Sequence, residues 1–191
     1  RWHLRRRLVL LGVVESRAME RRTPIIRVKQ FTAAYDGVVL LNDLSFDVYG
    51  GEVFVILGGS GCGKSTMLKH MIGLYQPAAG AILIDGEDIV TAQGPRRLAI
   101  LKKIGVMYQQ GALFGSMTLL ENVRLPLEEY TDLPNDAIDH IALMKLQVVG
   151  LGAAALKLPD EISGGMRKRA AIARAMALDP QVLFLDEPSA G

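Results

Sequence analysis

Short apolar runs alternate along the chain with longer segments of helical periodicity, and this pattern predicts an α/β protein. Strands are predicted at six places, residues 25–31, 44–48, 53–57, 81–84, 104–108 and 181–185. The first two of these segments alternate apolar and polar side chains, which is typical of strands with one buried face. The other four are nearly continuous apolar runs, which indicates strands in the interior of the protein.

Helices are predicted between the strands, at residues 64–71, 95–103, 118 onward, 135–149 and 163–176. The helix after Thr118 has the spacing of a capping box, because Glu121 stands three residues later. Pro126 predicts that this helix kinks or stops, since proline lacks the backbone N–H that a helix interior uses. We therefore expect residues 111–162 to form a small helical insertion between strands.

The most specific motif lies between the strand at 53–57 and the helix at 64–71. It matches G-x-x-x-x-G-K-[ST] and consists of Gly58, Gly59, Ser60, Gly61, Cys62, Gly63, Lys64, Ser65 and Thr66. The glycines let the backbone N–H groups approach a polyanion in front of a helix N-terminus. Lys64 can then reach the β- and γ-phosphates, the Ser65 hydroxyl can ligate Mg²⁺, and Thr66 can contact the α-phosphate side. A flexible Gly/Ser loop would not explain a Lys-Ser-Thr in this position, so we expect a phosphate-binding loop.

Two carboxylates, Asp186 and Glu187, come directly after the apolar strand at 181–185. In an open α/β sheet the carboxyl ends of the strands form the ligand edge. At that edge Asp186 can hold Mg²⁺ through water, and Glu187 can polarise the attacking water of a phosphoryl transfer. An exposed acidic turn is the alternative, but two carboxylates directly after an apolar strand favour the catalytic interpretation.

A second candidate anion site is formed by Ser163, Gly164, Gly165 and Met166, which precede an Ala-rich basic helix. Small residues at the start of a helix leave its first backbone N–H groups exposed. Ser-Gly-Gly alone is common in loops. Here the motif follows a phosphate loop and precedes Asp186 in the sequence, and this order makes it a specific indication of a second anion site.

The composition limits the class of protein. Half of the 191 residues are hydrophobic (50%) and the net charge is +2, which is typical of a globular domain and gives no indication of nucleic-acid binding. One cysteine cannot form an internal disulfide and fits a reducing compartment. Residues 1–22 contain a basic start and a short apolar run, 8–14, far shorter than the ~20 residues of a membrane-spanning helix. They resemble a signal peptide, but we expect an extension outside the fold, with Met19 as the natural start.

Together these motifs resemble the ATP-binding subunits of ABC transporters over residues 25–191. The resemblance implies a P-loop NTPase (RecA-like) core, residues 23–110 and 163–191, with N-terminal antiparallel β strands. It also implies that the helical subdomain at 111–162 carries the signature region, and that the fold is incomplete at the C-terminus.

The same resemblance assigns roles to individual residues. It implies that Tyr35 stacks on adenine, that Gly58–Thr66 are the Walker A loop, and that Gln109 is the Q-loop glutamine. Gln109 would then act in catalysis and, with Ser65 and Asp186, hold Mg²⁺. Residues 163–166 look like the signature motif, which binds the ATP of a partner subunit. Asp186 looks like the Walker B aspartate and Glu187 like the catalytic glutamate.

The family pairs two subunits head to tail, so that each ATP lies between one Walker A loop and the other subunit's signature. The resemblance therefore implies ATP and Mg²⁺ as cofactors, and a second copy of the chain and membrane permease subunits as partners. It places the protein on the cytoplasmic face of the inner membrane. The D-loop aspartate and the switch histidine are expected beyond Gly191, since His3, His70 and His140 do not stand where the family has that histidine. We therefore expect a C-terminally truncated chain that hydrolyses little ATP alone.

Two segments, Gln109–Phe114 and Ile162–Arg169, resemble the Mla/Mkl-type branch, and Met166 replaces the usual signature glutamine. That branch implies an MCE-type lipid-binding partner and the transport of phospholipid or another hydrophobic molecule. The alternatives are an ABC ATPase for another substrate class and a soluble, non-transport ABC protein acting on ribosomes or DNA. A P-loop kinase and a non-catalytic interaction module are further alternatives. The transported molecule, the direction of transport and the permease stay open.

Overall fold

The structure, a computed structural model, describes residues 9–11, 23–35, 37–59, 61–109 and 111–188. Ser60, one of the predicted phosphate-loop residues, lies outside the described residues. The chain divides into two compact units, Arg1–Ile100 and Leu101–Gly191, and each is described by itself. This division differs from the predicted one, in which residues 111–162 stand apart, and that domain assignment stays a prediction.

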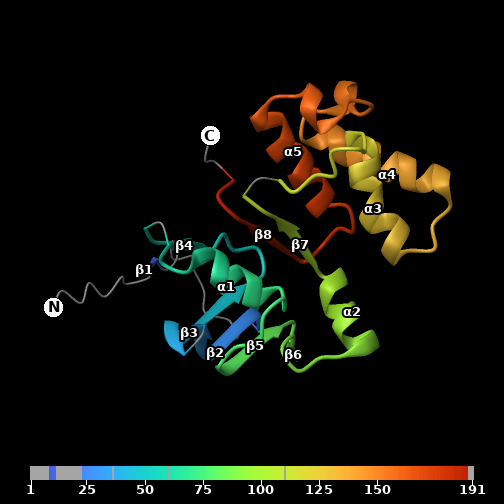
Figure 1. The fold of residues 1–191 in the computed structure, drawn as a ribbon. Coiled ribbons are helices and arrows are strands. Elements are labelled where there is room, and N and C mark those ends of the chain that lie inside the picture. Colours follow the sequence, from blue (N-terminus) through green and yellow to red (C-terminus); the bar gives the residue numbers. More distant parts are fainter. Residues whose placement is uncertain (1–8, 12–22, 36, 60, 110, 189–191) are drawn as a thin grey trace. The chain divides into compact units, whose positions relative to one another are not determined.

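The first unit is built on an antiparallel sheet with the strand order β3-β2-β5-β6 (Figure 1). Its strands are β2 (Pro24–Tyr35), β3 (Val38–Tyr49), β5 (Ala79–Ile84) and β6 (Glu87–Asp88). Alternate residues of the two central strands are buried, because successive side chains of a strand point to opposite faces; these are Ile26, Val28, Ile82 and Ile84. The predicted N-terminal antiparallel strands are therefore confirmed, and they are longer than the sequence pattern indicated.

A second, short pair of strands consists of β4 (Val55–Leu57) and β1 (Val9–Leu11), which run antiparallel. The predicted extension at residues 1–22 thus includes three residues that pair with the fold. An unpaired strand edge exposes backbone N–H and C=O groups that an apolar segment can satisfy. The remainder of that extension lies outside the described residues.

Two helices accompany these sheets, α1 (Lys64–Met71) and α2 (Gly94–Lys102). Helix α1 follows β4 through the predicted phosphate loop and buries Met67, His70 and Met71. Arg97 of α2 donates from Nη1 to the Ile89 carbonyl oxygen at 3.1 Å and from Nη2 to the carbonyl oxygen of Gly73, just beyond α1. The Arg97 side chain of α2 thereby fixes the backbone just beyond the C-terminal end of α1.

The second unit contains two parallel strands, β7 (Ile104–Met107) and β8 (Val182–Leu185), paired with Met107 opposite Leu185. Three α-helices lie in the same unit, α3 (Leu119–Tyr130), α4 (Asn135–Val148) and α5 (Gly164–Ala175) (Figure 1). Short 3₁₀ turns at Gly152–Ala154 and Pro159–Glu161 lead from α4 to α5.

One hydrophobic core joins these three helices, and each contributes fully buried side chains, among them Val123, Ala142 and Ala170. Helix α5 therefore packs with α3 and α4 as one body. The capping box at Thr118 is confirmed: the backbone N–H of Glu121 donates to Thr118 Oγ1 at 3.2 Å, and that of Thr118 donates to Glu121 Oε2 at 2.7 Å.

Of the two outcomes predicted at Pro126, a kink or a stop, the stop is wrong, because α3 continues to Tyr130. The kink stays a prediction. Val123 and Leu127, on either side of the proline, are both buried in the core. Tertiary packing of an apolar helix face supplies most of the stability of a helix in a protein. Here that burial outweighs the backbone hydrogen bond that the proline cannot make.

Gly105 in β7 generates a testable prediction about stability. A Cβ at this position would lie 2.0 Å from the Ala175 carbonyl oxygen, which belongs to the backbone of α5. We expect Gly105→Ala to lower the free energy of unfolding by about 1–3 kcal/mol, as overpacking does. Urea unfolding of the full-length protein measures this. The matched control is Gly115→Ala, because a Cβ there meets nothing within 4 Å. Equal stability of the two variants would contradict the close approach of α5 to β7.

Candidate functional site

The phosphate loop turns from β4 into α1 through glycines in left-handed conformations. Gly61 has φ 72° and Gly63, the N-cap of α1, has φ 105°. A Cβ on Gly63 would also lie 2.9 Å from Leu41 Cδ2. The Gly63 carbonyl oxygen accepts the first helical hydrogen bond, from the Met67 N–H at 2.8 Å. Position 63 therefore requires glycine both for its conformation and for the space beside it.

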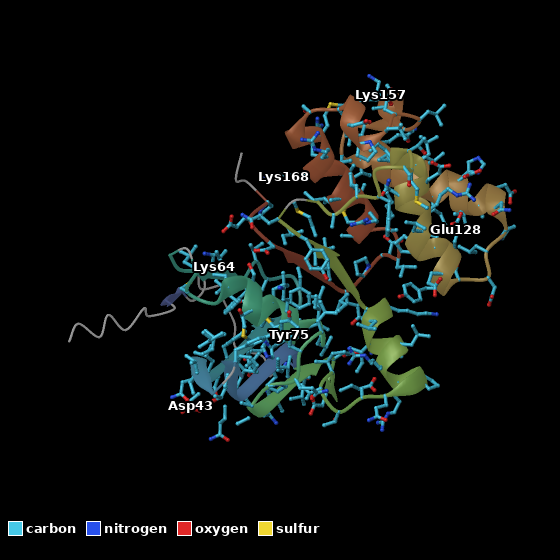
Figure 2. The ribbon with its side chains drawn as sticks, in the orientation of Figure 1. Asp43, Lys64, Tyr75, Glu128, Lys157 and Lys168 are labelled. Atoms are coloured by element: carbon cyan, nitrogen blue, oxygen red, sulfur yellow. The ribbon has the colours of Figure 1, made fainter. Side chains whose placement is uncertain are left out.

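Lys64, the first residue of α1, folds back over the loop (Figure 2). Its Nζ donates to the carbonyl oxygens of Gly58 at 2.8 Å and Gly59 at 3.2 Å. The ammonium group thus stands over the loop that precedes a helix N-terminus, where backbone N–H groups favour an anion. Ser65 is exposed in the first turn, while Cys62 is buried, with 7% of its surface exposed.

Tyr35 ends β2 with 57% of its surface exposed, so it can offer a ring face to a flat ligand. Its ring makes an edge contact with Tyr75, with centroids 6.2 Å apart. Tyr75 in turn contacts the buried His70 edge-on at 5.6 Å, and Lys69 Nζ lies 5.5 Å from the Tyr75 ring centroid. Sequence reasoning missed Tyr75, because no local pattern links a residue beyond α1 to the end of β2.

Gln109 and Glu187 meet in the second unit, beyond the carboxyl ends of the adjacent strands β7 and β8. Gln109 Nε2 donates to Glu187 Oε2 at 2.7 Å. The backbone N–H of Asp186 donates to the Met107 carbonyl oxygen at 2.9 Å, which continues the ladder between the two strands. Glu187 has φ 51°, an uncommon conformation for a residue other than glycine. The sequence-predicted acidic pair and the predicted glutamine therefore lie together.

The predicted signature residues form the start of α5. Ser163 is the N-cap, and its Oγ accepts the Met166 N–H at 3.3 Å. Gly164 and Gly165 are exposed, and a Cβ on Gly165 would meet nothing within 4 Å. Arg167 Nη1 donates to the Ile162 carbonyl oxygen at 2.9 Å, which fixes the residue before the cap. The exposed N-terminus of α5 is suited to contact an anion.

The site residues thus belong to two sets. Tyr35 and the loop at 58–66 lie in the first unit, while Gln109, residues 163–166 and the pair Asp186–Glu187 lie in the second. Among the described residues, no three His, Cys, Asp or Glu side chains come together to hold a metal. Magnesium is commonly bound by one or two carboxylates together with substrate phosphates. Asp186 supplies such a carboxylate, and the Ser65 hydroxyl and Gln109 amide are oxygen donors of the required kind.

A phosphate loop, a carboxylate pair after a parallel strand and a capped Ser-Gly-Gly helix together define a nucleotide-binding cassette. The family model for the ABC transporter family matches residues 41–190. The chain therefore belongs to the ABC transporter family.

Two named groups of proteins are among the curated relatives. The chain is 48% identical over 166 residues to the probable ribonucleotide transport ATP-binding protein mkl of Mycobacterium leprae, covering 87% of this chain and 48% of that protein. It is 42% identical over 167 residues to the intermembrane phospholipid transport system ATP-binding protein MlaF of Haemophilus influenzae, covering 87% of this chain and 63% of the relative. The chain thus spans about half to two thirds of the length of these relatives.

Solved structures confirm the cassette fold. A dimeric ATP-binding cassette in a post-hydrolysis state, bound to ADP and Pi, matches with a TM-score of 0.80 and 32% identity, covering 86% of this chain and 74% of that one. The structure of cbiO1 from Clostridium perfringens, part of the transporter complex cbiONQ, matches with a TM-score of 0.78 and 32% identity, covering 88% and 67%. Within the described part of the chain, no helix is both long and apolar enough to cross a membrane.

The position of Lys64 over the loop predicts its effect on nucleotide affinity. Lys64→Ala removes a charge-assisted contact to phosphate, so we expect ATP to bind the full-length protein about tenfold more weakly or worse. Isothermal titration calorimetry measures the affinity. Lys102→Ala is the control, since Lys102 is an exposed lysine in the last turn of α2 and has no part in the phosphate loop. If both variants bound ATP like the wild type, Lys64 would have no role in nucleotide binding.

Proposed function

We propose that this chain is the nucleotide-binding part of an ABC transporter subunit. It binds ATP with Mg²⁺, hydrolyses it, and couples hydrolysis to the movement of phospholipid or another hydrophobic molecule between envelope membranes. The observation that carries the proposal is the hydrogen bond of 2.7 Å between Gln109 and Glu187 beyond the paired strands β7 and β8. It brings a water-activating carboxylate and an amide together at the edge where α/β proteins bind ligands.

ATP binding rests on the residues of the first unit. The backbone N–H groups of the loop and the N-terminus of α1 receive the phosphates, and Lys64 turns from the loop carbonyls to the β- and γ-phosphates. Tyr35 stacks its exposed ring on adenine. Tyr75, in edge contact with Tyr35, limits how far that ring can tilt.

Hydrolysis rests on the residues of the second unit. Phosphoryl transfer depends mainly on positioning and on neutralising charge. Glu187 accepts a hydrogen bond from the attacking water and orients it. Asp186 and Gln109 of this unit would hold Mg²⁺, together with Ser65, which belongs to the first unit. The metal, when bound, neutralises charge on the phosphates. The hydrogen bond from Gln109 to Glu187 restrains the carboxylate before the water arrives.

The partners follow from the site and from the relatives. Ser163, Gly164 and Gly165 lie exposed at the start of α5, followed by the half-buried Met166, and there they can contact the ATP of a second copy in a head-to-tail dimer. The matched cassette with ADP and Pi is itself dimeric. Permease subunits would hold such a dimer at the cytoplasmic face of the inner membrane. An MCE-type lipid-binding protein would be the further partner of a lipid transporter.

A second substrate class has specific support, because the two groups of relatives carry different names. The MlaF relatives are named for intermembrane phospholipid transport, whereas the mkl relatives are named for probable ribonucleotide transport. We favour the lipid because Gln109–Phe114 and Ile162–Arg169 resemble the Mla/Mkl-type branch, and that resemblance implies transport of phospholipid or another hydrophobic molecule. The ribonucleotide is the alternative.

Glu187→Gln tests the catalytic assignment. The substitution keeps the shape and removes the charge that orients water, so ATP binding stays and hydrolysis falls about 100-fold or more. Phosphate release and calorimetry on the full-length protein measure the two effects. We also expect ATP to trap the variant as a dimer, seen by light scattering. The control is Glu161→Gln, which changes a glutamate in the turn before α5. Normal turnover by Glu187→Gln would show that another group activates the water.

The substrate class is tested in proteoliposomes that contain the full-length protein and its permease subunits. We expect ATP to drive exchange of a fluorescent phospholipid between these vesicles and acceptor vesicles, and Glu187→Gln to abolish it. Radiolabelled ribonucleotide uptake is measured in parallel. Ribonucleotide uptake without lipid exchange would reject the lipid and leave the ATPase assignment intact.

A further inference from the structure

One arginine fixes the segment that follows Gln109 to helix α5. Arg174, in the last turn of α5, donates from Nη1 to the Ala112 carbonyl oxygen at 2.8 Å and from Nη2 to the Gly111 carbonyl oxygen at 2.9 Å. A guanidinium presents its donors in a rigid planar fork, so it can hold two successive carbonyls in one orientation. Lysine could supply the charge but not this paired geometry.

The segment that Arg174 contacts, residues 111 and 112, has left-handed backbone conformations and packs closely against α5. Gly111 has φ 76° and Ala112 has φ 47°, so two successive residues are left-handed. A Cβ on Gly111 would lie 3.4 Å from Ala171 Cβ, which places this glycine directly against α5. A left-handed residue other than glycine persists only where its surroundings enforce it. The two hydrogen bonds from Arg174 supply that constraint at Ala112.

A second helix holds the other end of the same segment. The Phe114 N–H donates to Asn122 Oδ1 at 2.8 Å, and Asn122 Nδ2 donates to the Phe114 carbonyl oxygen at 3.1 Å. Asn122 lies in α3 and is fully buried. At the N-terminal end of the segment, the Gly111 N–H donates to the Tyr108 carbonyl oxygen at 2.7 Å, which closes a turn that contains Gln109. Residues 111–114 are thus fixed from α5 at one end and from α3 at the other.

The surroundings of Arg174 strengthen the contact. Burial lowers the pKa of Arg174, and burial likewise raises the pKa of Tyr108, whose ring lies near the guanidinium. Hydrogen bonds that are shielded from water are stronger than exposed ones, and a buried donor that loses its acceptors costs stability. The hydrogen bond to Gly111 is partly buried and the one to Ala112 is exposed, so burial strengthens chiefly the contact with Gly111.

We propose that Arg174 is a positioning residue that couples the signature end of α5 to Gln109 and, through Gln109, to Glu187. The inference rests on the proposed function, because it concerns the same site. Helix α5 is a rigid rod of 12 residues, roughly 18 Å long, with Ser163 capping one end and Arg174 in the last turn at the other. A displacement of the signature end therefore moves Arg174, and with it the turn that places the Gln109 amide at the Glu187 carboxylate.

Arg174→Gln and Arg174→Lys in the full-length protein test the proposal. Both variants lose the paired contact, so we expect the amides of residues 111–114 to exchange hydrogen for deuterium faster, with exchange elsewhere in α3 and α4 unchanged. We expect kcat for ATP hydrolysis to fall about 10- to 100-fold, as small misplacements of catalytic groups do, with little change in ATP affinity. Arg174→Lys retains the charge and therefore reports whether the paired geometry matters.

Arg169→Gln is the matched control, because Arg169 in the same helix donates to a different loop, to the Val149 carbonyl oxygen at 2.8 Å. It should accelerate exchange near Val149 and leave both kcat and residues 111–114 as in the wild type. Faster exchange throughout the second unit in both Arg174 variants would mean that Arg174 is merely structural and would overturn the proposal. Unchanged exchange at 111–114, or a normal kcat with faster exchange there, would overturn it as well. If the wild type hydrolysed no ATP, the proposed function would fail, while the exchange measurement would still test the contact.

Discussion

The second unit depends on how closely helix α5 approaches strand β7. The Ala175 carbonyl oxygen lies so near Gly105 that no side chain fits between them. Because α5 also contributes to the core shared by α3 and α4, this single approach ties the helices to the paired strands β7 and β8. The chemistry attributed to the unit is placed by the same packing, since the signature residues begin α5 while Gln109 and Glu187 follow the strands.

Backbone geometry, more than side-chain charge, shapes both halves of the candidate site. In the first unit, Gly63 can adopt its left-handed conformation beside Leu41 because it has no side chain. In the second unit, Ala112 and Glu187 adopt left-handed conformations without that freedom. Such residues are uncommon, and surrounding contacts are needed to hold the backbone in that conformation. The Arg174 guanidinium donates a hydrogen bond to the Ala112 carbonyl oxygen, and the Gln109 amide donates one to the Glu187 carboxylate.

The family and the fold of the chain are supported by separate findings. Family membership follows from the match over residues 41–190, and the fold from solved cassettes at 32% identity. The curated relatives differ in the substrate for which they are named, a ribonucleotide for the mkl proteins and phospholipid for the MlaF proteins.

Local signals in the sequence determined the phosphate loop, the caps at Thr118 and Ser163 and the strand that delivers the acidic pair. Each of these features is set within a few residues, by the φ that glycine permits, by a hydroxyl that accepts a backbone N–H, or by apolar periodicity. The edge argument for parallel strands concerned Asp186 and Glu187, whereas Gln109 was assigned through the family resemblance. The structure brings Gln109 to Glu187 although 78 residues separate them.

Only the tertiary structure decided the contacts that no local rule encodes. Helix α3 continues past Pro126 because the side chains around the proline are buried, and Arg174 reaches Ala112 across 62 residues because α5 lies against that turn. Tyr75 meets Tyr35 for the same kind of reason. Periodicity and capping report which elements form, whereas these contacts depend on which elements pack together, and packing is set by the summed burial of residues far apart in the chain.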